Sequence, residues 1–174
     1  MKGMTSEWLQ DRLVGLAGAM LRTRRLARAP IWLYRARLGV IFGHRLLMLE
    51  HIGRVSGERR HVVLEVVDNP GPGEYVIASG FGLRAQWLRN ILKNPHVRVS
   101  IASHRDTPAT AAPLDPEQAA IVLRRYAVAH PRAWQRLKPV FEQTLGAPIN
   151  EAGTSLPMVR LTTDRPIGGR PPRA

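Results

Sequence analysis

The sequence contains no cysteine and only three lysines among its 174 residues. The absence of cysteine excludes a disulfide framework, a thiolate metal site and a cysteine nucleophile, and it fits a reducing compartment. No apolar run approaches the roughly 20 residues that a membrane-spanning helix needs. The run from Leu13 to Leu21 also lacks the flanking charges of a secretory signal. We therefore expect a cytoplasmic protein without a cleaved targeting segment.

Carboxylates are also scarce, because 13 acidic residues stand against 26 lysines and arginines, which gives a formal net charge of +13. A field of this sign predicts an anionic partner: nucleic acid, an anionic membrane or an anionic small ligand. Nucleic acid is the least favoured, because the chain lacks the interleaved basic and aromatic residues of a single-strand platform. A hydrophobic content of 44% is typical of a globular domain with a core.

The first 43 residues predict a basic, amphipathic helical segment. Apolar positions over residues 6–26 fall near helical spacing, and the stretch from Arg12 to Arg45 holds eight arginines and no carboxylate. This pattern is typical of a helix lying on an anionic membrane, here at its inner face. An ordinary helix with its basic face in water is the alternative. Residues 164–174, rich in proline, glycine and arginine, are expected to form a disordered tail.

Residues 44–163 predict a single folded domain. Short apolar and β-branched runs are separated by glycine and proline, which indicates strands. The expected strands are residues 46–52, 61–67, 75–79, 97–101, 107–112 and 155–163, with a turn at 69–73 and helices at 85–93, 115–129 and from the His130-Pro131 break to 145. Meandering strands with segregated helices indicate an α+β fold whose sheet closes into a small barrel.

The turn at residues 53–60, with the sequence GRVSGERR, carries three arginines. A hairpin needs only its glycines, so the arginines point to an anion. Backbone amides in such a turn can form an anion-binding nest, and Ser56 adds a hydroxyl. Arg54 and Arg60 can each bind phosphate or carboxylate through two hydrogen bonds. A solvated hairpin tip is the alternative interpretation.

A second constellation begins with the glycines of residues 78–82, which allow close approach of a ligand to the backbone. Trp87 and Asn90 follow, three residues apart and therefore on one face of a helix. A ring and an amide side by side suit a flat heteroaromatic ligand. The alternative is that Trp87 packs in the core and Asn90 caps the helix.

Four short segments together resemble the deazaflavin-dependent nitroreductase and F420H2-dependent quinone reductase family: GRVSG at 53–57 with Arg60, Ala78-Ser79, WLRN at 87–90 and KNPHV at 93–97. The resemblance covers roughly residues 31–163. It implies a split β-barrel related to FMN-binding barrels, commonly paired as a homodimer. It also implies that coenzyme F420 supplies hydride to a lipophilic acceptor such as a quinone or an activated alkene.

The resemblance assigns cofactor binding to Arg54, Val55, Ser56, Gly57, Arg60, Ser79, Gly80, Trp87 and Asn90. The turn would hold the phosphate and the carboxylates of the cofactor tail, and Ser79, Trp87 and Asn90 would lie near its ring. Val55 stands where the family turn usually has lysine. Gly80 stands where a lysine often follows the serine.

Tyr126, His130 and Trp134 recur every four residues where nitroreductases carry tyrosines, so we expect them to bind the substrate. Core and cap positions are the alternative. Ser79 and Tyr126 are the candidate proton donors, with solvent as another. The histidines have neither helical ligand spacing nor a carboxylate partner, so no metal site is expected. A non-catalytic module that binds a lipid or fatty acid and an FMN-binding protein remain the alternative functions.

Overall fold

The computed structural model describes residues 44–149 and 154–164. The helix predicted at 6–26, with its proposed membrane contact, lies outside these residues, as does all of the tail predicted at 164–174 except Asp164. No helix within the described part of the chain is long and apolar enough to cross a membrane.

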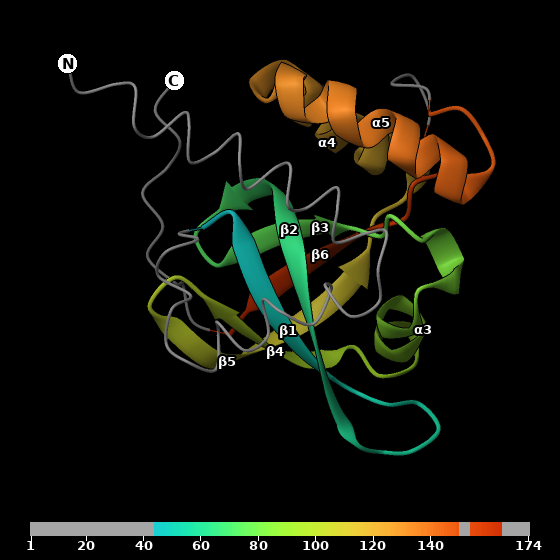
Figure 1. Cartoon of the computed structure of the whole chain (residues 1–174). Helices are drawn as coiled ribbons and strands as arrows, with labels where there is room; N and C mark the ends of the chain where they lie inside the picture. The colour runs from blue at the N-terminus through green and yellow to red at the C-terminus, as the bar shows by residue number, and fades with distance from the viewer. Residues whose placement is uncertain (1–43, 150–153, 165–174) are drawn as a thin grey trace.

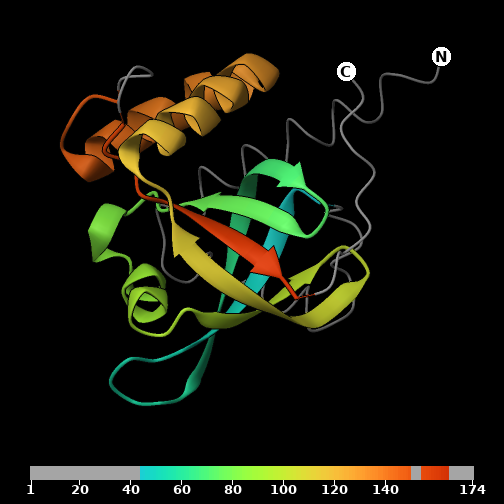
Figure 2. The same ribbon diagram turned by 180° about the vertical axis from the view of Figure 1, so that it is seen from behind.

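Six antiparallel strands close into a barrel in the order β1-β2-β3-β6-β5-β4 (Figure 1 and Figure 2). The strands are β1 (Leu46–Ile52), β2 (Arg59–Gly71), β3 (Glu74–Ala78), β4 (His96–Ile101), β5 (His104–Pro113) and β6 (Met158–Thr163). The predicted α+β class and the closed sheet are therefore confirmed.

The inside of the barrel is filled by alternate residues of each strand, as the two-residue period of a strand requires. Leu47, Leu49 and Val99 are fully buried there, together with Tyr75. The helix α3 (Gln86–Lys93) contributes three residues to the same cluster: Trp87, Leu88 and Ile91. The barrel and α3 thus share one core.

The helices α4 (Pro116–Ala129) and α5 (Pro131–Leu145) pack with the outward residues of the sheet, among them Val76 and Met158. The side chain of Asp115 accepts a hydrogen bond from Gln118 N at 2.8 Å, which confirms the predicted start of α4. Pro131 begins α5, as its break after His130 predicts. This helical pair lies on the opposite side of the barrel from the turn at 53–60 (Figures 1 and 2).

Several predicted boundaries are wrong. The turn expected at 69–73 is shorter, because β2 continues to Gly71 and only Pro72 and Gly73 separate it from β3. Two register shifts interrupt this pairing, and such bulges accommodate the proline of β2. The strand expected at 107–112 begins at His104, and the strand expected at 155–163 begins at Met158.

Candidate functional site

The arginine turn, residues 53–60, follows β1 and projects beyond the barrel (Figure 1). It is shorter than predicted, because Arg59 and Arg60 already pair with β1 as the first residues of β2. Two backbone hydrogen bonds close it, from Gly53 N to Glu58 O and from Gly57 N to Gly53 O, each 2.8 Å. Gly57 has a φ of 69°, a left-handed conformation that glycine adopts without steric cost. The glycines therefore give the turn its shape.

Gly53 also makes room for the cationic side of the turn. A Cβ atom at this position would lie 2.7 Å from Ser56 Oγ and 2.9 Å from Arg60 Nε. Arg60 Nη2 donates to Ser56 Oγ at 3.3 Å and lies 3.5 Å from a carboxylate oxygen of Glu58. The Arg60 side chain remains 54% exposed, so it is accessible to a ligand. Val55 is 91% exposed and adds no charge.

Arg54 connects the turn to α3. Its Nη1 group donates to Gln86 Oε1 at 2.9 Å and to Asn90 Oδ1 at 3.0 Å. Its backbone N donates to the same Asn90 oxygen at 3.1 Å. No hydrogen bond from Arg54 Nε or Nη2 is found within residues 44–149 and 154–164, so one edge of the guanidinium can still bind an anion.

Asn90 is 3% exposed, and its amide nitrogen donates to His51 Nδ1 at 3.1 Å. His51 ends the inward row of β1 and is 4% exposed. Burial lowers the pKa of His51 to about 4, and the charges of His61 and Arg60 act in the same direction. His51 is therefore neutral at pH 7. Sequence reasoning missed both His51 and Gln86 as members of this cluster.

Ser79 and Trp87, which are predicted to lie near the cofactor ring, are both buried. Ser79 is 1% exposed, and its hydroxyl donates to Gly82 O at 2.8 Å. Trp87 is 9% exposed and belongs to the barrel core, as the alternative interpretation expected. Gly80 is half-buried in the segment between Ser79 and Gly82. The roles of these residues in binding a ring stay predictions.

A hollow of about 330 Å³ lies next to the segment from Ser79 to Gly82. Its walls come from the short 3₁₀ helix η3 (Gly82–Arg84) and the end of α5, with Phe81, Leu83 and Leu145 as apolar lining. Arg84 Nη2 donates to Thr144 O at 2.7 Å and joins the two walls.

Tyr126 belongs to a different cluster, on the outside of the barrel. Its hydroxyl donates to Glu65 Oε1 at 3.0 Å, and Arg45 Nη2 donates to the same oxygen at 3.3 Å. Burial and the neighbouring Glu65 carboxylate raise the pKa of the Tyr126 hydroxyl. The hydroxyl proton of Tyr126 is thus engaged in the hydrogen bond to Glu65. The role of Tyr126 as a proton donor stays a prediction.

The predicted substrate residues are only partly brought together. Tyr126 and Trp134 line a common cavity of about 50 Å³ between the helical pair and the sheet. His130 is exposed, and its ring centroid lies 5.2 Å from that of Tyr126. The cavity is far below the roughly 300 Å³ of a typical ligand pocket, so a bulky acceptor does not fit in this arrangement.

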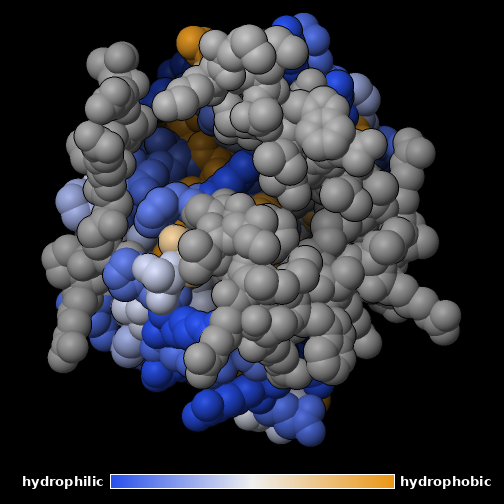
Figure 3. All heavy atoms as spheres, turned by 60° about the vertical axis from the view of Figure 1, so that its left-hand side comes forward, coloured by the Kyte–Doolittle hydropathy of each residue, from blue (hydrophilic) through white to orange (hydrophobic). Residues whose placement is uncertain are grey.

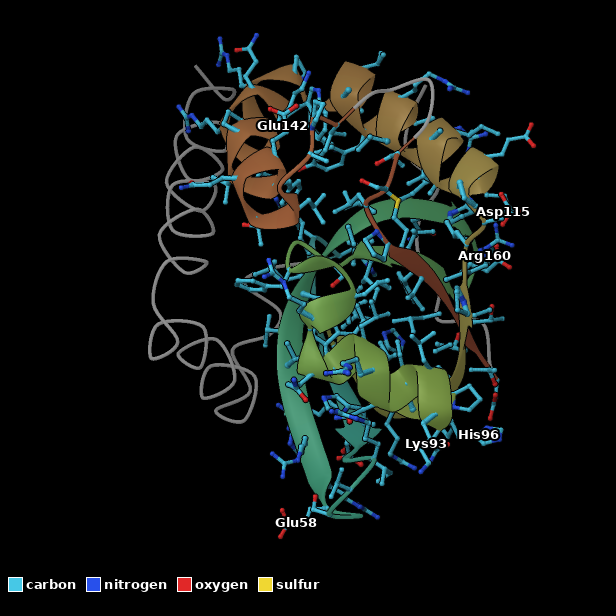
Figure 4. All side chains as sticks on the ribbon, turned by 90° about the vertical axis from the view of Figure 1, so that its right-hand side faces the viewer. Glu58, Lys93, His96, Asp115, Glu142 and Arg160 are labelled. Atoms are coloured by element: carbon cyan, nitrogen blue, oxygen red, sulfur yellow. The ribbon has the colours of Figure 1, made fainter. Side chains whose placement is uncertain are left out.

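Hydrophilic side chains cover most of the described surface on the side that Figure 3 shows. Glu58 marks the tip of the arginine turn at the end of the molecule far from Glu142 of α5 (Figure 4).

The expectation that no histidine has a carboxylate partner is wrong, because His61 Nε2 lies 3.1 Å from Glu50 Oε2. The described residues contain no cluster suited to a metal ion.

Comparison with known proteins gives a family and a fold. The family model of the F420H(2)-dependent quinone reductases matches residues 26–141, more than half of the chain. The protein Atu2129 of Agrobacterium tumefaciens, of unknown function, is 17% identical with a TM-score of 0.51, over 79% of this chain and 56% of that one. The F420-H2 dependent reductase FDR-A is 19% identical with a TM-score of 0.48, over 68% and 95%. No curated protein matches.

Proposed function

Because the chain belongs to the F420H2-dependent quinone reductase family, we propose that it reduces a lipophilic acceptor, such as a quinone or an activated alkene, with reduced coenzyme F420. The observation that carries the proposal is the arginine turn, which α3 fixes through Arg54 while one edge of the guanidinium stays available. This turn is held in place by α3 and presents arginine N–H donors to solvent, so it suits a polyanionic cofactor tail.

The residues of the turn fit the tail of the cofactor. Arg54 and Arg60 would bind its phosphate and carboxylates, with the Ser56 hydroxyl as a neutral donor. The amide of Gly57 already donates to Gly53 O and only shapes the turn. Val55, which replaces the usual lysine, would contribute only backbone. The Glu58 carboxylate beside Arg60 would be displaced by the incoming anion, since that pair is exposed and weak.

When bound, reduced F420 would supply the hydride. The chain's own residues would orient the ring and exclude water around it. Ser79 already donates its hydrogen to Gly82 O, so its oxygen can accept a hydrogen bond from a ligand but has no free proton to give. Tyr126 is likewise committed to Glu65. We therefore propose solvent as the source of the proton that the acceptor takes up.

The hollow between η3 and the end of α5 is the better candidate for the acceptor. It is larger than the cavity at Tyr126 and Trp134. It also reaches Gly82, which bonds to Ser79 at the predicted ring end of the cofactor. Most of its lining is polar, but Phe81 and Leu83 are exposed apolar side chains at its wall that a lipophilic molecule would cover.

The test is a fluorescence titration of the full chain with F420, compared with FMN, for wild type, Arg54→Ala and Arg60→Ala. We expect wild type to bind F420, and each variant to weaken binding at least about tenfold through loss of a charged hydrogen-bond donor. Arg132→Ala removes the same charge from an exposed site on α5 and should leave the affinity within about twofold. Absence of F420 binding by wild type, or FMN binding alone, would refute the proposal.

We also propose that residues 1–43 contact an anionic membrane, because of their charge pattern. The family resemblance further leads us to propose that the chain pairs as a homodimer. Flotation of the chain with anionic vesicles tests the first, and deletion of residues 1–26 should abolish flotation. Light scattering tests the second, with a dimer mass as the expected result and a monomer mass as the contrary one.

A further inference from the structure

His51 lies where the end of β1 meets α3, and its ring is almost fully enclosed. Its side chain makes a hydrogen bond between Nδ1 and the amide nitrogen of Asn90, at 3.1 Å, and the backbone of Ile52 also contacts the ring. An amide nitrogen can only donate, so Nδ1 must accept and must carry no proton. The ring is therefore neutral with its hydrogen on Nε2. A pKa lowered by burial agrees with that state.

This acceptor and the two donors of Arg54 require the same orientation of the Asn90 amide. With its nitrogen turned to His51, the amide presents Oδ1 to two donors of Arg54, the backbone N and Nη1. The reversed amide would place an NH2 group against both of those donors and a carbonyl against the histidine. Such an arrangement leaves buried groups unpaired and is unfavourable.

The oriented amide in turn sets the position of the Arg54 side chain. Nη1 is held between Asn90 and Gln86, both on α3. The Nε and Nη2 edge of the guanidinium is then held in one orientation. A donor fixed before binding loses less conformational entropy when its anion arrives.

We propose that His51 is a positioning residue of the arginine turn: through Asn90 it holds Arg54 in the orientation that receives an anionic ligand. The inference rests on the proposed function for the identity of that ligand, the F420 tail. His51 touches no ligand in this scheme and acts only through the amide. Nothing in the spacing of residues 51, 54 and 90 indicates this connection.

The experiment compares two substitutions of the buried ring in F420 titrations of the full chain. His51→Leu removes the acceptor, and we expect the dissociation constant to rise at least about fivefold, as for loss of a buried hydrogen bond. His51→Asn places an oxygen near the former Nδ1 and should restore the affinity to within about twofold. Equal affinities of wild type and His51→Leu, with F420 bound by both, would overturn the inference and leave the proposed function intact.

A double-mutant cycle separates positioning from general damage to the fold. In an Arg54→Ala background, His51→Leu should change the dissociation constant by less than about twofold, because the group it positions is gone. A further fivefold loss there would mean that His51 acts by another route and would overturn the inference. Failure of wild type to bind F420 would instead count against the proposed function.

A measurement on the wild-type chain keeps the inference testable if His51→Leu does not fold. Nitrogen-15 NMR of the imidazole at pH 7 distinguishes the two neutral tautomers and the charged ring. The expected result is the tautomer protonated on Nε2. A ring protonated on Nδ1 could not accept from Asn90 and would overturn the inference.

Discussion

Tyr126 of α4 donates a hydrogen bond to Glu65 of β2 at 3.0 Å, across 61 residues of sequence. Arg45 donates to the same carboxylate oxygen. This contact ties the helical pair to the outside of the barrel, as does the ion pair between Arg125 of α4 and Asp68 of β2, at 3.5 Å. It also makes Tyr126 a structural residue in this arrangement, whatever it does with a substrate.

Tyr126→Phe should therefore lower the free energy of unfolding by about 2 kcal/mol, because the lost bond has a charged acceptor. Tyr75 offers the matched control, since it is fully buried in the barrel and its hydroxyl has no partner among the described residues. Tyr75→Phe should leave stability unchanged or raise it by up to about 1 kcal/mol. Urea unfolding of both variants measures the difference. Equal losses in the two variants would contradict the assignment.

Local signals in the sequence predict most of the elements. Asp115 followed by Pro116 indicates the start of α4, and Pro131 separates α4 from α5, because capping and the missing amide act over a few residues. The alternation of apolar and polar residues in β4 is equally local. The family motif further predicts that the arginine turn and Asn90 serve one site, and in the structure Arg54 and Asn90 are bonded.

Contacts that depend on strand order are not visible in the sequence. His51 meets Asn90 only because β1 and α3 share the barrel core, and Tyr126 meets Glu65 only because α4 packs outside β2. The extension of β2 to Gly71 was also missed, because proline and glycine normally end a strand, whereas here bulges admit them. These two contacts and the extension of β2 all depend on tertiary packing.

Gly53 provides a prediction about the turn itself. A Cβ atom there would collide with Ser56 Oγ and Arg60 Nε, so Gly53→Ala should push Arg60 outward. We expect the dissociation constant for F420 to rise about tenfold, because the cationic side of the turn loses its arrangement. The free energy of unfolding should fall by less than about 1 kcal/mol, because these side chains are exposed and can move.

Gly146→Ala is the control with the opposite pattern. Gly146 ends α5 with a φ of 72° and has no atom within 4 Å of a new Cβ. The left-handed conformation should cost about 1 kcal/mol of stability, while F420 affinity stays unchanged. If Gly53→Ala binds F420 as wild type does, the arrangement of Ser56 and Arg60 is not needed for the tail.

The buried state of His51 predicts how stability depends on pH. Burial lowers its pKa from 6.5 to about 4, helped by the charges of His61 and Arg60 and opposed by Glu50. Between those values the unfolded chain binds a proton that the folded chain excludes. The free energy of unfolding therefore falls as the pH drops from about 6.5 to about 4. A shift of this size corresponds to about 3 kcal/mol.

Urea unfolding between pH 7 and pH 4.5 measures this contribution as the difference between wild type and His51→Asn, which cannot titrate. Other groups titrate in this range but are common to both proteins, so they cancel in the difference. The advantage of wild type over His51→Asn should shrink steadily as the pH falls. The exposed His96, substituted by asparagine, should follow the wild-type curve. Parallel curves for wild type and His51→Asn would show that His51 is not held neutral, and the orientation of Asn90 would then lack its cause.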